Sequence, residues 1–97
     1  MTASRKNRLQ ASHATGATSP PLIETPIGRY FESVAARFTD NEALVSRHQG
    51  VRMTYRELDR ESGRLASALL RSGLGRGDRA GIWAHNSAEW LLMQLAT

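Results

Sequence analysis

The sequence predicts an α/β fold in which a helix, a β-hairpin, a second helix, a strand and a third helix follow one another over residues 25–97. Three observations carry this prediction. Apolar residues recur at helical spacing in two separate stretches, two short apolar runs flank a turn that contains glycine, and a further apolar run follows a group of glycines. A length of 97 residues allows no more than one small domain.

The first 24 residues are expected to form a disordered basic tail, because they are rich in Ser, Thr and Ala and follow neither a helical nor a strand period. Three basic residues, Arg5, Lys6 and Arg8, precede the first acidic one, Glu24. A basic leader without acids is also typical of a mitochondrial transit peptide. Because its large apolar residues are too few for an amphipathic face, we favour a plain leader and a cytoplasmic location, with the mitochondrial matrix as the alternative.

The first helix is predicted to begin at Thr25 and Pro26, because threonine is a good N-cap and proline suits the first helical position. Apolar residues spaced three or four apart then form one face. They are Ile27, Tyr30, Phe31, Val34, Ala35 and Phe38. We interpret this stripe as core rather than as a cofactor contact.

Two short apolar runs, Ala43–Val45 and Val51–Met53, are predicted to pair as a β-hairpin. The turn between them contains Gly50, and His48 is expected at its exposed tip.

The second helix has the clearest boundary signals in the chain. Thr54 and Glu57 match a capping box, in which each side chain accepts a hydrogen bond from the other residue's backbone amide. Gly73 stands where a left-handed residue ends a helix, and Leu74 is placed for the hydrophobic contact that accompanies this ending.

Residues 75–78 are predicted to form a turn, and Arg79–Ala84 a strand. Asn86 or Ser87 is expected to cap the third helix, with Glu89 in its first turn. The apolar run that follows reaches Thr97 without a stop signal, so the chain is expected to be truncated within this helix.

Charge and composition exclude several classes of function. The net charge of +4 comes mostly from the tail, and the signs alternate along the second helix, so nucleic-acid binding is not expected. The chain has no cysteine, which excludes disulfides and thiolate catalysis. No apolar run is long enough for a membrane span.

The sequence predicts no catalytic, cofactor-binding or metal-binding residue. The glycines of residues 73–77 follow a helix and precede a strand, which is the reverse of a phosphate-binding loop. The three histidines lack the spacing of metal ligands, and the carboxylates Asp59 and Glu61 are expected on the solvent side of the second helix. No role in a site is predicted for His13, His48 or His85, and packing or capping is the expected use of Tyr55, Trp83 and Asn86.

The sequence resembles the opening of the acyl-CoA synthetases in the adenylate-forming superfamily. The stretches that carry the resemblance are residues 35–38 (AARF), 42–45 (EALV), 53–59 (MTYRELD), 65–69 (LASAL), 77–79 (GDR) and 81–90 (GIWAHNSAEW). The last stretch is most similar to the fatty acyl-CoA synthetases, in which Ile-Trp and Glu-Trp are familiar.

The resemblance implies that residues 25–97 form the incomplete N-terminal part of a large AMP-binding (adenylation) domain. Members of this family use ATP and Mg²⁺ to convert a carboxylate into an acyl-adenylate, and then transfer the acyl group to coenzyme A. The expected substrate of the parent enzyme is a fatty acid. The phosphate loop, the Tyr-Gly-x-Thr-Glu stretch, the adenosine-binding aspartate and the catalytic lysine of the family lie downstream, so the 97-residue chain alone is expected to be inactive.

Two alternatives remain open. One is the adenylation domain of a nonribosomal peptide synthetase, which loads a carrier protein instead of coenzyme A. The other is a non-catalytic remnant or small interaction module that has kept the opening segment without its chemistry.

Overall fold

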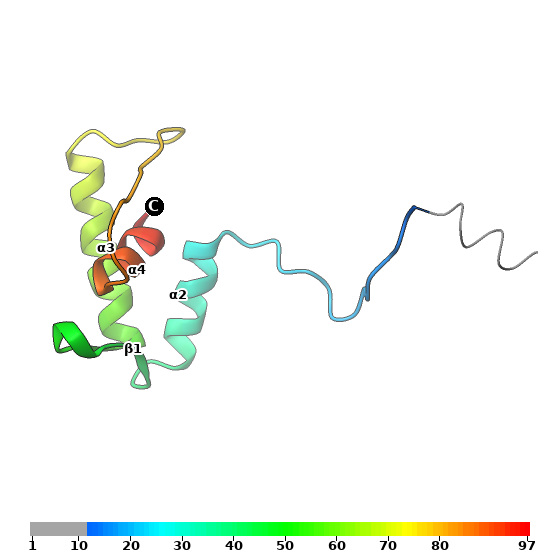
Figure 1. The fold of residues 1–97 in the computed structure, drawn as a ribbon, viewed down its shortest axis with the longest axis horizontal. Coiled ribbons are helices and arrows are strands. Elements are labelled where there is room, and N and C mark those ends of the chain that lie inside the picture. Colours follow the sequence, from blue (N-terminus) through cyan, green and yellow to red (C-terminus); the bar gives the residue numbers. More distant parts are fainter. Residues whose placement is uncertain (1–11) are drawn as a thin grey trace, which may run out of the picture.

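A computed structural model describes residues 12–97. The basic residues predicted for the tail, Arg5, Lys6 and Arg8, lie outside the described residues. From residue 12 to residue 26 the chain forms no helix or strand and is exposed throughout. In Figure 1 this segment runs away from the helices.

The remaining residues form three helices and one hairpin, and the longest helix is α3 (Tyr55–Arg71; Figure 1). The helix α3 contacts both other helices and both strands, so it organises the packing of the described residues. The elements in chain order are α2 (Ile27–Arg37), β1 (Glu42–Ser46), the 3₁₀ turn η1 (Arg47–Gln49), β2 (Val51–Thr54), α3 (Tyr55–Arg71) and α4 (Ala88–Ala96).

The helix α2 is confirmed, but its predicted start is wrong by one residue. Pro26 has an extended conformation with ψ of 147° and itself occupies the N-cap position, without a side-chain hydrogen bond to the helix. Its carbonyl accepts the first helical hydrogen bond, from the Tyr30 amide at 3.0 Å. Thr25 therefore lies outside the helix and is not the cap.

The hairpin is confirmed, and each strand is longer than predicted. The strands are antiparallel, with Val45 opposite Arg52 and Ser46 opposite Val51. The register shifts between Glu42 and Leu44, which marks a bulge. Gly50 closes the turn with φ of 67°, a left-handed conformation that glycine adopts without a steric penalty.

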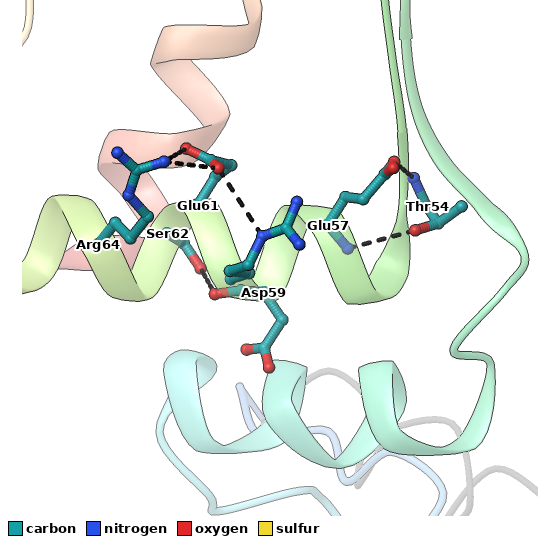
Figure 2. A network of polar contacts seen from close by, with 7 residues as sticks. Thr54, Glu57, Asp59, Glu61, Ser62 and Arg64 are labelled. Carbon is teal, nitrogen blue, oxygen red and sulfur yellow. Dashed lines mark hydrogen bonds and ion pairs between the residues drawn. The ribbon is translucent and has the colours of Figure 1, made fainter.

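Both predicted ends of α3 are confirmed. Figure 2 shows the capping box: the Glu57 amide donates to Thr54 Oγ1, and the Thr54 amide donates to Glu57 Oε2. At the other end Gly73 has φ of 104°, and the amides of Gly73 and Leu74 donate to the carbonyls of Leu70 and Leu69. This pair of hydrogen bonds is the Schellman motif.

The predicted strand over residues 79–84 does not form. A strand needs a neighbour for its backbone hydrogen bonds, and the sheet in the described part of the chain consists of β1 and β2 alone. Residues 79–84 instead run as an extended exposed segment beside α3 and α4. The rest of the predicted α/β order is confirmed.

The core of the described residues is small. Its buried apolar side chains are Ala35, Leu58 and Ala88. Beside them Tyr55 packs against Phe31 and Phe38, with both pairs of ring centroids 6.2 Å apart, so packing is confirmed as the role of Tyr55.

Candidate functional site

A hollow lies between α3, α4 and the segment that precedes α4. We call it the α3–α4 groove, and its volume is about 810 Å³. Its apolar lining comes from Leu65, Ala68, Ile82, Leu92 and Met93, and its charged lining from Glu61, Arg64, Arg71 and Glu89. An apolar surface with a few charges is typical of a ligand site or of a surface that another part of a protein covers.

The charges along α3 that border this groove are largely paired. Figure 2 shows Arg64 Nη1 donating to both carboxylate oxygens of Glu61, at 3.1 and 3.4 Å. Arg60 lies on the other side of the same carboxylate, at 3.9 Å. These arginines are mostly exposed, so each pair contributes little to stability, about 0–1 kcal/mol.

The prediction that Asp59 and Glu61 lie on the solvent side of α3 is wrong. Both residues are half-buried. Figure 2 shows the Asp59 side chain pointing from α3 towards α2. Asp59 lines a second hollow of about 600 Å³ between α2, α3 and the end of α4, whereas Glu61 lines the α3–α4 groove. The two carboxylates therefore serve different surfaces and do not form an acid/base pair.

The N-terminus of α3, an end of a helix where anions often bind, is already satisfied by this chain. The Tyr55 amide donates to the Asn41 carbonyl at 3.0 Å, and the Arg56 amide to the Thr39 carbonyl at 3.1 Å. The Glu57 amide donates to Thr54 Oγ1. These three amides are therefore not free to hold the phosphates of a nucleotide.

A second polar cluster joins the tip of the hairpin to the start of α4. We call Ser46, Gln49, Ala88 and Glu89 the Gln49 cluster. Gln49 Oε1 accepts from Ser46 Oγ at 2.7 Å and from the Ala88 amide at 2.9 Å, and Gln49 Nε2 donates to Glu89 Oε2 at 2.8 Å. Gln49 could not be found from the sequence, because its partners on α4 lie 39 and 40 positions away and no local pattern connects them.

The pKa of Glu89 is lowered. The hydrogen bond from Gln49 is the largest cause, followed by a hydrogen bond from its own backbone, and burial opposes them slightly. The smaller contributions of Ser87 and His48 also lower this pKa. The carboxylate is thus held in the charged form, which also suits its position in the first turn of a helix.

The other residues considered for a site are dispersed. His13, His48 and His85 are exposed in three separate segments, and residues 12–97 contain no group of three His, Asp or Glu side chains suited to a metal ion. Ser87 rather than Asn86 is the N-cap of α4, accepting from the Trp90 amide at 3.4 Å. The prediction that Trp83 is used for packing is wrong for the described residues, because Trp83 is fully exposed.

No helix in the described range 12–97 combines the length and the apolar character needed to cross a membrane.

Comparison with known proteins decides the family. The AMP-binding enzyme family matches residues 31–97, which is more than half of the chain. The chain belongs to the AMP-binding enzyme family. The α/β arrangement of Figure 1 is accordingly a piece of an adenylation domain, and the resemblance to acyl-CoA synthetases is confirmed.

The chain is similar to several acyl-CoA ligases. It is 43% identical over 86 residues to the medium-chain acyl-CoA ligase ACSF2, mitochondrial, of Mus musculus, and 44% identical over 86 residues to the Homo sapiens protein of the same name. It is 41% identical over 76 residues to the putative acyl-CoA synthetase YngI of Bacillus subtilis. These matches cover 89%, 89% and 78% of the chain but only 14% of each relative. No solved structure matches the chain.

Proposed function

We propose that the whole protein to which this chain belongs is an ATP-dependent acid–CoA ligase. Such an enzyme joins a carboxylate to AMP with release of pyrophosphate, and then transfers the acyl group to the thiol of coenzyme A. The observation that carries the proposal is the identity of 43% to a named acyl-CoA ligase over 86 residues.

Carboxylate activation explains why such an enzyme needs ATP. A carboxylate oxygen is a poor leaving group, and attachment to AMP converts it into a good one. Mg²⁺, when bound, would stabilise the charge that develops on the phosphates. Among the described residues, no three His, Cys, Asp or Glu side chains gather as a metal-ion site, and the first amides of α3 are occupied by this chain. We therefore assign none of their side chains to catalysis, cofactor binding or metal binding.

We propose that residues 25–97 form the incomplete N-terminal part of the adenylation domain, after a tail of residues 1–24. Their role is scaffold: α3 holds α2, the hairpin and α4 in place. Because the chain spans only 14% of its relatives' length, we expect the 97-residue chain alone to be inactive.

The proposed substrate is a fatty acid. The names of the animal relatives specify medium-chain acyl-CoA ligases, which supports a medium acyl chain. The same names include the word mitochondrial, which supports the matrix alternative for the location. We retain a cytoplasmic location as the proposal, since the tail has few large apolar residues for an amphipathic leader.

The test is product formation by the whole protein with ATP, Mg²⁺ and a panel of short-, medium- and long-chain fatty acids and amino acids. We expect a fatty acyl-CoA thioester, formed fastest from a medium-chain acid, together with AMP and pyrophosphate. Adenylation of an amino acid with no transfer to coenzyme A would support the peptide synthetase alternative. No adenylation of any acid by well-folded protein would support a non-catalytic module.

A further inference from the structure

One side chain, Gln49, bridges the hairpin tip and the start of α4 by hydrogen bonds. Gln49 makes three hydrogen bonds of 2.7 to 2.9 Å within the Gln49 cluster, which use its carbonyl oxygen twice and its amide nitrogen once. Two of these bonds reach α4, one to its first amide and one to a side chain of its first turn. A polar side chain with this many aligned partners is strongly oriented.

The start of α4 receives such support from outside the helix. Its own N-cap, Ser87, accepts from the Trp90 amide at a long 3.4 Å, and the Ala88 amide is satisfied by Gln49 instead. The first turn of α4 is thus capped partly from within the helix and partly from the hairpin.

We propose that Gln49 makes the hairpin tip and α4 one cooperative unit, so that the helix begins only when the hairpin is seated against it. A consequence follows for the α3–α4 groove. Glu89, Leu92 and Met93 of α4 line this groove, whereas Gln49 does not. The hairpin tip therefore controls one wall of a hollow that it does not itself line.

Hydrogen exchange of backbone amides in the full chain tests this proposal. Gln49→Ala removes all three bonds, and we expect exchange to become faster on the order of tenfold both in α4 and in residues 47–54. Arg47→Ala is the matched control, because it truncates an exposed side chain on the same turn. Faster exchange of the Ala88 amide alone in Gln49→Ala, or an equal acceleration in Gln49→Ala and Arg47→Ala, would overturn the proposal.

A second test, which swaps the amide and the carboxylate between positions 49 and 89, still applies if Gln49→Ala impairs folding. Gln49→Glu places a second carboxylate against Glu89 and should accelerate exchange in both elements. Adding Glu89→Gln to it restores a donor and an acceptor in reversed order, so the double variant should recover most of the protection. Amide exchange is also measured in Glu89→Gln alone. If exchange in the double variant is no slower than the summed effects of Gln49→Glu and Glu89→Gln predict, the bond between these residues does not couple the hairpin to α4.

Discussion

Gly63 and Gly73 differ in backbone conformation, so alanine at the two positions should change the stability of the chain in opposite directions. Gly73 ends α3 with φ of 104°, whereas Gly63 lies inside α3 and a Cβ there would meet no atom within 4 Å. Gly73→Ala should destabilise the chain by about 1 kcal/mol, because an L-residue is strained in the left-handed region. Gly63→Ala should stabilise it by up to about 1 kcal/mol through helix propensity.

Urea denaturation of both variants measures this difference in the free energy of unfolding. The decisive quantity is the sign of the two changes rather than their size. A stabilising effect of Gly73→Ala would mean that Gly73 does not end the helix in the left-handed conformation, and a destabilising effect of Gly63→Ala would contradict the argument from helix propensity.

Glu89 gives the chain a specific dependence on pH. Because its pKa is lowered in the folded state, chiefly by Gln49, its contribution to stability is present above the pKa of an unfolded carboxyl group. That contribution is lost as the pH falls through the lowered pKa, since the folded state then binds the proton that the unfolded state has already taken up.

Denaturation of the wild type and of Glu89→Gln across this acidic range checks the prediction. We expect the wild type to lose part of its stability relative to Glu89→Gln as the pH falls. A constant difference between the two proteins would show that the carboxylate of Glu89 contributes nothing in its charged form.

At the scale of the element, local signals were sufficient to predict the helices and hairpin. The capping box of Thr54 and Glu57 and the left-handed Gly73 involve residues within a few positions of one another, and both were found from the sequence. The start of α2 was missed by one residue, because the choice between Thr25 and Pro26 depends on a single ψ angle.

Features that depend on distant partners could not be predicted in this way. The apolar run within residues 79–84 favours a strand, but a strand exists only when a neighbour accepts its hydrogen bonds. The role of Gln49 could not be predicted for the same reason, since its partner Glu89 on α4 is 40 positions away. The orientation of Asp59 towards α2 likewise depends on how two helices pack.

At the scale of the whole molecule, the described residues expose much apolar surface for so small a core. Leu58 is 2% exposed, whereas Leu70 is 67% exposed and Trp83 is fully exposed. The α3–α4 groove adds an apolar hollow bordered by paired charges. A surface of this kind suits a scaffold that serves a larger catalytic domain, in agreement with a match that covers 14% of each ligase.

We propose that this chain belongs to an adenylating enzyme and does not carry out adenylation by itself. The most direct measurement is carboxylate-dependent exchange of labelled pyrophosphate into ATP, made in parallel with the 97-residue chain and with the whole protein. We predict exchange by the whole protein in the presence of a fatty acid, and none by the 97-residue chain. Exchange catalysed by the 97-residue chain alone, or no exchange by the correctly folded whole protein with any acid, would contradict this proposal.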